Sequence, residues 1–235
     1  MSPKVIVALD YGEMKPVKEI VKKIGSAADW YKVGLELFVS CGPEALDFLR
    51  SEGKKIFLDL KFHDIPNTVS GALLSSLQYG VDMVNVHAQG GVEMMKTSAL
   101  ALREESAKRG VTPPLVIAVT LLTSLDEAYL IKNKLGFAGA EDYVLHLAET
   151  VKEAGLDGVV SSARETSVIK SVLGKDFITV TPGIRPADSS TDDQKRVVTP
   201  LDAKKLGTDF IVVGRPITKA ADPFLAASRI KEEMR

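Results

Sequence analysis

The sequence predicts an α/β fold in which eight strand–helix units close into one barrel, and three observations support this prediction. Short apolar runs rich in β-branched residues recur eight times along the 235 residues. Amphipathic stretches separate most of these runs, and most are long enough for a crossover helix with two short loops. No Pro-, Gly- or Ser-rich linker interrupts the pattern, so residues 1–235 are expected to form a single (β/α)8 domain.

The eight apolar runs are the expected strands. Their nearly continuous apolar character, rather than strict alternation, is typical of parallel strands that are buried on both faces. In chain order they are Val5–Leu9, Trp30–Val33, Ile56–Leu60, Met83–Val86, Val116–Val119, Gly158–Val160, Ile178–Val180 and Phe210–Val213. An open, doubly wound sheet is the alternative arrangement of the same units.

Apolar residues spaced three and four apart predict helices between the strands. Val17, Ile20, Val21 and Ile24 form the clearest pattern, and similar patterns follow at 45–49, 73–77 and 143–151. The longest interval between strands is expected to contain an extra short helix over residues 125–134.

Composition and charge exclude several classes of protein. Thirty Lys and Arg residues balance 31 Asp and Glu residues, so the formal charge of −1 offers no basic excess for nucleic acid or an anionic membrane surface. The longest apolar run, 115–122, is too short to span a membrane, and the segment after Lys4 is too short for a signal-peptide core. The single cysteine, Cys41, is expected to be a small packing residue. We therefore expect a cytoplasmic protein.

Charged residues stand near the carboxyl ends of the first three expected strands, where the active sites of such barrels form. Asp10 ends the first strand, Lys32 lies in the second, and Asp59, Lys61 and Asp64 lie in or just beyond the third. Asp59 and Lys61 are two residues apart and so share a face of a strand. One such pair is consistent with a structural ion pair. Alternating charges from three strands favour a catalytic cluster instead, in which each ion offsets the desolvation of its neighbour.

The three histidines are expected to support the fold rather than the chemistry. We expect packing or hydrogen-bonding roles for His63 and His87, and a structural role for His146 within a helical pattern. No pair of them has the spacing of metal ligands, so a His-based metal site is not expected.

The segments after the last two strands predict a phosphate site. Gly214 would let a phosphate approach the backbone, Arg215 offers a forked cation, and Pro216 suits the first turn of a helix. The polar stretch 187–196 comes after the seventh strand, and we expect it to close as a lid; a disordered insertion is the alternative. Arg185 and Gln194 would then donate to an anion.

One block of ten residues resembles a known family. Residues 59–68, Asp-Leu-Lys-Phe-His-Asp-Ile-Pro-Asn-Thr, are similar to the signature of the orotidine 5′-phosphate decarboxylases, which form UMP in the last step of de novo UMP synthesis. The resemblance spans essentially the whole chain, in order and spacing. Its other parts are Asp10, Tyr31–Gly34, Thr120–Ser124, Thr181–Pro186, Gln194 and Gly214–Arg215.

The resemblance implies a role for each of these residues. Lys61 would donate a proton to C6 of the pyrimidine, flanked by Asp59 and Lys32. Asp64 would complete the charge array from the neighbouring protomer, with Ile65 and Thr68 also reaching across, so the active enzyme would be a homodimer with shared sites. The other implied contacts are those of Asp10 and Lys32 with the ribose hydroxyls, of Thr123 with the pyrimidine, and of Arg185, Gln194, Gly214 and Arg215 with the phosphate. The resemblance implies no metal ion and no organic cofactor.

Two other functions fit parts of the pattern. A metal-dependent decarboxylase or aldolase of sugar phosphates is similar in its Asp-x-Lys-x-x-Asp spacing, and Glu36 would then be the acidic ligand near the second strand. Lys32 would repel that cation. A non-catalytic binder of phosphate ligands would need only the phosphate site. The charged cluster of residues 59–64 is complete, which favours the decarboxylase.

Overall fold

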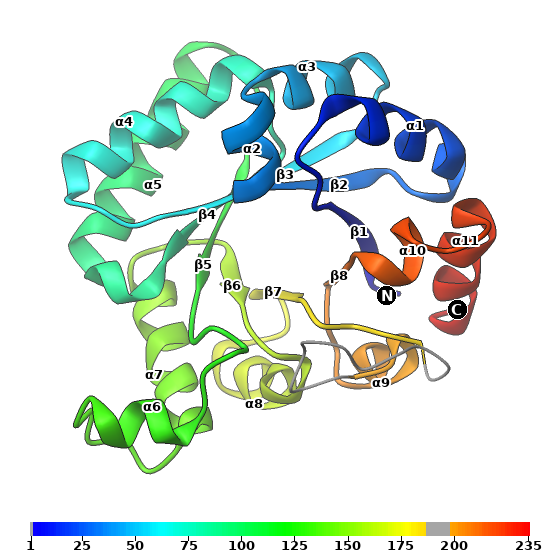
Figure 1. The fold of residues 1–235 in the computed structure, drawn as a ribbon. Coiled ribbons are helices and arrows are strands. Elements are labelled where there is room, and N and C mark those ends of the chain that lie inside the picture. The colour runs from blue at the N-terminus through cyan, green and yellow to red at the C-terminus, as the bar shows by residue number, and fades with distance from the viewer. Residues whose placement is uncertain (1, 187–197) are drawn as a thin grey trace.

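The computed structural model describes residues 2–186 and 198–235, and it confirms the predicted barrel (Figure 1). Eight parallel strands pair in chain order, and β1 is hydrogen-bonded to both β2 and β8, which closes the ring. The open-sheet alternative is therefore wrong. The strands are β1 Lys4–Leu9, β2 Trp30–Gly34, β3 Lys55–Phe62, β4 Met83–His87, β5 Leu115–Val119, β6 Gly158–Val160, β7 Ile178–Thr181 and β8 Phe210–Val213.

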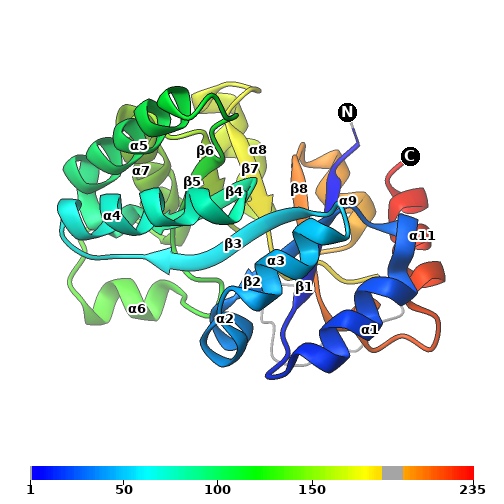
Figure 2. The same cartoon turned by 90° about the horizontal axis from the view of Figure 1, so that it is seen from above.

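Helices surround the ring of strands (Figure 2). They are α1 Met14–Ile24, α2 Leu35–Cys41, α3 Glu44–Ser51, α4 Pro66–Ser76, α5 Gly91–Lys108, α6 Glu127–Lys132, α7 Ala140–Glu153, α8 Ala163–Leu173, α9 Pro200–Lys205, α10 Arg215–Thr218 and α11 Pro223–Glu233. Short 3₁₀ turns occupy Gly25–Ala27, Leu77–Tyr79 and Ala88–Gly90. Helix α6 is the extra short helix predicted for residues 125–134. Among the described residues, no helix is long and apolar enough to cross a membrane.

Helix α1 shows how the apolar spacing produces the helix layer. Its four predicted residues, Val17, Ile20, Val21 and Ile24, are all buried, since positions three and four apart share one face of a helix. Basic residues in the last turn face the negative end of the helix dipole. Gly25 ends the helix with φ +55°, a left-handed conformation that glycine adopts without strain.

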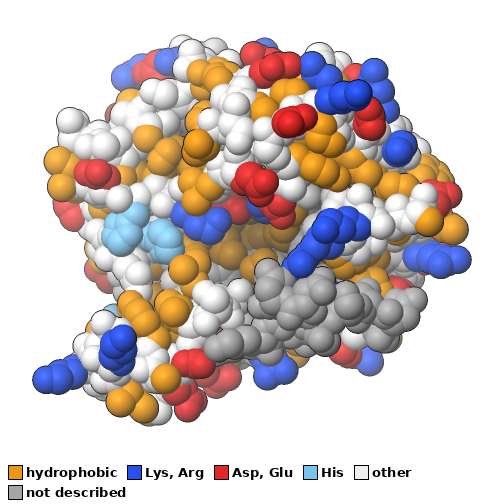
Figure 3. Space-filling view, in the orientation of Figure 1, with side chains coloured by type: hydrophobic (Ala, Val, Ile, Leu, Met, Phe, Trp, Pro, Cys, Tyr) orange, Lys and Arg blue, Asp and Glu red, His pale blue; other side chains and the backbone are white. Residues whose placement is uncertain are grey.

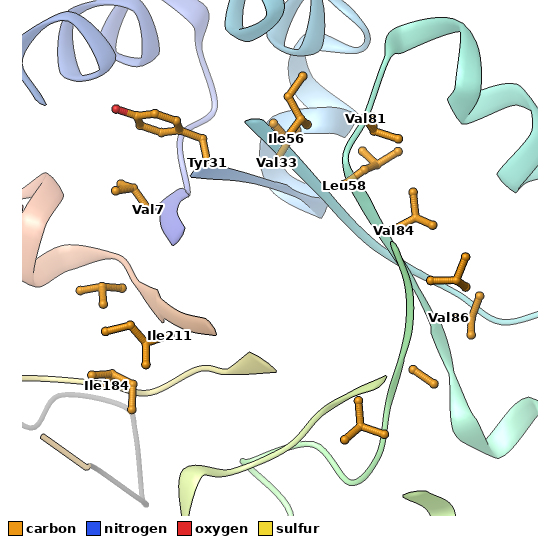
Figure 4. Close-up of a cluster of buried hydrophobic side chains, with 14 of the residues drawn as sticks. Val7, Tyr31, Val33, Ile56, Leu58, Val81, Val84, Val86, Ile184 and Ile211 are labelled. Atoms are coloured by element: carbon orange, nitrogen blue, oxygen red, sulfur yellow. The ribbon is translucent and has the colours of Figure 1, made fainter. Parts of the chain in front are cut away.

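The strands separate the hydrophobic core into two layers. The larger layer lies between strands and helices, and Figure 4 shows residues from it, among them Val7, Tyr31 and Val84. The smaller layer lies on the opposite faces of the strands, inside the ring, and includes Ile6 and Phe57. Burial on both faces explains why these strands read as continuous apolar runs.

The inner faces of β2 and β3 change character along their length. Trp30 and Phe57 belong to the inner layer, near the amino ends of their strands. Lys32 and Asp59 come two residues later, so they continue the same inward rows toward the carboxyl ends. The alternation of the strand therefore aims these charged side chains into the mouth of the barrel.

Gly158 on β6 packs closely against the backbone of β7, and this contact gives a stability prediction. A Cβ atom at residue 158 would lie 2.1 Å from the carbonyl oxygen of Ile178, so Gly158→Ala forces two paired strands apart. Such overpacking costs about 1–3 kcal/mol, so we expect the melting temperature to fall by roughly 2–12 °C. Calorimetry of Gly158→Ala beside Gly12→Ala, where an added Cβ meets only Ser40 at 4.0 Å, checks this expectation. Equal melting temperatures for the two variants would contradict it.

Candidate active site

Two adjoining hollows open at the carboxyl ends of the strands. Each has a volume of about 190 Å³. The first lies against β1, β8 and the segment after β7, and the second against β3, β5 and β6. Both are lined by Lys32, Pro182 and Val212, so together they form one cleft. Figure 3 faces this end of the barrel and shows acidic and basic side chains gathered around the hollow.

A larger hollow of about 970 Å³ lies at the opposite end of the barrel, around the amino ends of β1, β7 and β8. It contains neither Asp59 nor Lys61. Because the predicted cluster lines the smaller cleft, and because barrels of this type carry their chemistry at the carboxyl ends, we place the site in the cleft.

Four predicted residues form a chain of alternating charge across β1, β2 and β3. The Lys32 Nζ atom lies 3.1 Å from Asp10 Oδ1 and 3.4 Å from Asp59 Oδ2, and Lys61 Nζ lies 2.6 Å from Asp59 Oδ1. The Lys32 and Asp59 side chains are only 13% and 10% exposed, so this central pair is shielded from solvent and interacts more strongly than a surface pair. Lys61 is 29% exposed at the cleft. The alternation lets each ion offset its neighbour's desolvation.

The backbone at Lys61 departs from the regular strand that the sequence indicates. Lys61 has φ +53°, in the left-handed region, and the pairing of β3 with β4 shifts register between Leu58 and Phe62. A residue other than glycine in this conformation costs on the order of 1 kcal/mol or more, and such strain collects at functional sites. Asp59 and Lys61 do come together, as predicted. A local irregularity of the strand, and not only the two-residue period, places the ammonium group.

Asn85 on β4 is a site residue that the sequence reasoning missed. It is fully buried, and its Nδ2 donates a hydrogen bond to Asp59 Oδ1 at 2.6 Å. Its Oδ1 accepts one from the backbone N–H of Lys61 at 2.8 Å. The available signal was a polar residue within the apolar run Met83–Val86, two positions after the inward-facing Met83.

The histidines lie beside the charged chain rather than within the cleft. The rings of His63 and His87 pack 5.3 Å apart, and neither residue lines either hollow. Burial lowers the pKa of His87, and the nearby His63 and Lys61 lower it further. This imidazole therefore stays neutral near pH 7 and adds no charge to the array. His146 packs against Phe137, with ring centroids 5.1 Å apart.

The first hollow carries the predicted phosphate residues Arg185, Gly214 and Arg215. Arg185 is buried, with 5% of its surface exposed, and its backbone N–H donates to the carbonyl oxygen of Val198 at 3.1 Å. Helix α10 begins at Arg215, as the sequence predicts. A Cβ at Gly214 would meet Ala8 and Asp10 only at 3.6 and 3.7 Å, so steric space alone does not require glycine there.

The remaining predicted residues fall into three groups. Thr123 lines the second hollow together with Lys61. Asp64, Ile65 and Thr68 are exposed at the end of β3 and the start of α4, and none of them lines the cleft of its own chain. Gln194 and the expected lid over 187–196 lie outside the described residues.

Comparison with known proteins places the chain in a family. The model of the orotidine 5′-phosphate decarboxylase/HUMPS family matches residues 3–230. The chain belongs to this family. An orotidine 5′-phosphate decarboxylase of Carboxydothermus hydrogenoformans is 47% identical over 235 residues, which cover 100% of this chain and 97% of that protein. One from Streptococcus pneumoniae is 48% identical over 229 residues, covering 97% and 95% of the two chains.

A solved structure supports the same family from the fold. The orotidine 5′-phosphate decarboxylase of Lactobacillus acidophilus superposes with a TM-score of 0.86 at 39% identity, and all of both chains is covered. The residues that resemble the pattern of this family include the four members of the charged chain and the two arginines of the first hollow.

Proposed function

We propose that this chain removes CO₂ from orotidine 5′-phosphate to form UMP, without a metal ion or organic cofactor. The observation that carries the proposal is the alternating chain Asp10–Lys32–Asp59–Lys61, which lines a cleft whose first hollow also carries two arginines. The full-length similarity to decarboxylases of this name supports it.

The cleft divides naturally between the two ends of this substrate. The pyrimidine would enter the second hollow, where Thr123 offers a hydroxyl group beside apolar side chains of β5 and β6. The phosphate would lie in the first hollow against Arg185, Gly214 and Arg215, with Gln194 as a further donor from outside the described residues. Asp10 and Lys32 line the first hollow near the junction, where they would hold the ribose hydroxyls.

The chemistry explains why ammonium and carboxylate groups are combined. When the bond between C6 and the carboxylate breaks, the electron pair remains on C6 in the plane of the ring, where neither the ring π system nor an imine accepts it. The ammonium group of Lys61 stabilises this charge as it develops and then transfers a proton to C6. Enzymes commonly lower such barriers by ~8–23 kcal/mol, more than one lysine supplies. Phosphate and ribose contacts contribute by aligning C6 with the ammonium group.

A homodimer with shared sites is part of this proposal. Asp64, Ile65 and Thr68 are exposed and do not line their own cleft, and Ile65 is 66% exposed. An exposed apolar residue next to a carboxylate suits contact with a second copy, in which Asp64 would extend the partner's charge array. A cytoplasmic location also belongs to the proposal, since the lone Cys41 fits a reducing compartment.

The metal-dependent alternative is less favoured by the geometry. Lys32 occupies the centre of the charged chain, where its ammonium group would repel a divalent cation. Glu36, the acidic residue that this alternative would use, is exposed on α2 and lines neither hollow.

A decarboxylation assay tests the proposal directly. The full chain is incubated with orotidine 5′-phosphate and EDTA, and the pyrimidine absorbance is followed with time. We expect turnover at the same rate with and without EDTA, because lysine supplies the positive charge. Loss of activity in EDTA with recovery on adding Mg²⁺ would support the metal-dependent alternative, and no turnover under any condition would refute the proposed reaction.

A further inference from the structure

The amide of Asn85 joins the two residues that the proposed reaction needs most. Its Nδ2 donates to Asp59 Oδ1 at 2.6 Å, and its Oδ1 accepts from the Lys61 backbone at 2.8 Å. The side chain is fully buried, yet it lines neither hollow of the cleft. Asn85 therefore contacts the charged residues on the side away from the cleft, where a substrate in the cleft would not touch it.

The first of these bonds orients a carboxylate. Asp59 Oδ1 receives Lys61 Nζ and Asn85 Nδ2, both at 2.6 Å, while Lys32 Nζ lies 3.4 Å from Oδ2. Without Asn85, the two ammonium groups alone would orient the carboxylate of Asp59. An amide donor adds a third contact without adding a charge, so the alternation of two carboxylates and two ammonium groups is kept.

The second bond supports an uncommon backbone conformation. At Lys61 the register of β3 against β4 shifts, so the regular ladder does not pair this N–H group. The Asn85 side chain takes the place of the missing ladder acceptor and holds Lys61 at φ +53°. That conformation directs the Lys61 side chain toward Asp59 and the cleft.

We propose that Asn85 is a positioning residue, which holds the Asp59 carboxylate and the Lys61 backbone in the geometry that places the ammonium group at the reacting carbon. This inference rests on the proposed decarboxylation. Asparagine is suited to the position because it is both a donor and an acceptor. Aspartate would offer only acceptors when ionised, and would set a second carboxylate against Asp59.

The experiment compares steady-state kinetics of the full chain, Asn85→Ala and Asn85→Asp with orotidine 5′-phosphate as substrate. Met83→Ala is the matched control, because Met83 is also fully buried, faces inward and lies two residues earlier on β4. For Asn85→Ala we expect kcat to fall by about 10²- to 10³-fold, since small misplacements of reacting groups have effects of this size. KM and the affinity for UMP should change by less than about five-fold, because phosphate and ribose bind elsewhere in the cleft.

The pH profile separates positioning from general damage to the barrel. For Asn85→Asp we expect kcat relative to wild type to rise as the pH falls, because the introduced carboxyl group donates to Asp59 only when it is protonated. Met83→Ala should keep the wild-type profile. If Asn85→Ala fails to fold, the pH profile of Asn85→Asp still tests the positioning role of Asn85.

Three results would overturn the inference. One is a kcat for Asn85→Ala within five-fold of wild type. Another is that Asn85→Ala loses kcat and UMP affinity in parallel, by the same factors as the control Met83→Ala. The third is an Asn85→Asp profile with the wild-type shape. If the wild-type chain is active and Asn85→Ala is equally active, only the role of Asn85 is refuted. A wild-type chain without turnover would refute the proposed reaction and this role with it.

Discussion

Lys61→Ala is expected to lower kcat by at least about 10⁴-fold, because it removes both the cation that stabilises the charge at C6 and the proton that quenches it. Binding should be far less affected. Arg185, Gly214 and Arg215 lie in the other hollow, so the affinity for UMP is expected to stay within about ten-fold of the wild-type value. Stopped assays for slow turnover and calorimetric titration with UMP measure the two effects separately.

Two further variants of β3 make this test specific. Lys55 lies at the amino end of the same strand, where its ammonium group is exposed and pairs with Asp82 at 3.6 Å. Lys55→Ala should retain near-wild-type turnover. Lys61→Gly should be as inactive as Lys61→Ala but more stable, since glycine adopts φ +53° without strain. Near-wild-type turnover in Lys61→Ala would refute the assignment of Lys61 as the proton donor.

Mixing inactive Lys61→Ala and Asp64→Ala chains is expected to restore activity. In a shared-site dimer, each mixed pair contains one cleft with an intact Lys61 from one chain and an intact Asp64 from the other. Random exchange of equal amounts makes half of the dimers mixed, so we expect recovery to about a quarter of wild-type activity. The measurement is decarboxylase activity after mixing, with subunit exchange verified by mass-tagged chains.

As a control, each variant is carried through the same exchange procedure alone. Both should stay inactive, because every cleft in such a dimer lacks the same group. No recovery in the mixed sample despite verified exchange would mean that Asp64 acts within its own chain, or not at all. That outcome would leave the exposed position of Asp64 and Ile65 to be explained by loop structure alone.

The order of the strands could be predicted from the sequence because burial on both faces leaves a strong local signal. Val5–Leu9 was expected as a strand and β1 spans Lys4–Leu9, while the run Gly158–Val160 coincides with β6. Boundaries differed where polar residues continue a strand. The apolar run of the third strand ends at Leu60, whereas β3 continues through Lys61 to Phe62.

The candidate site was predictable where side chains follow the period of a strand. Lys32 and Asp59 lie two residues beyond Trp30 and Phe57, and their inward direction follows from that spacing alone. The left-handed backbone of Lys61 was not predictable, because it depends on a long-range bond from Asn85 on β4. Asn85 itself leaves only a weak signal, since one polar residue in an apolar strand fits many structural roles.

The closure of the ring through β1 and β8 has a consequence for the order in which the site forms. Ile6 pairs with Val212, and Val7 with Val213, so the two strands that meet come from nearly opposite ends of the chain. Asp10 and Arg215, which line one hollow, follow directly after these strands. Contacts so distant in sequence must close a long loop, so we expect them to form after the pairs between strands that are neighbours in the chain. On this order, Lys32 and Lys61 would come together before the first hollow exists, and the ability to hold a nucleotide would follow the closure of the ring.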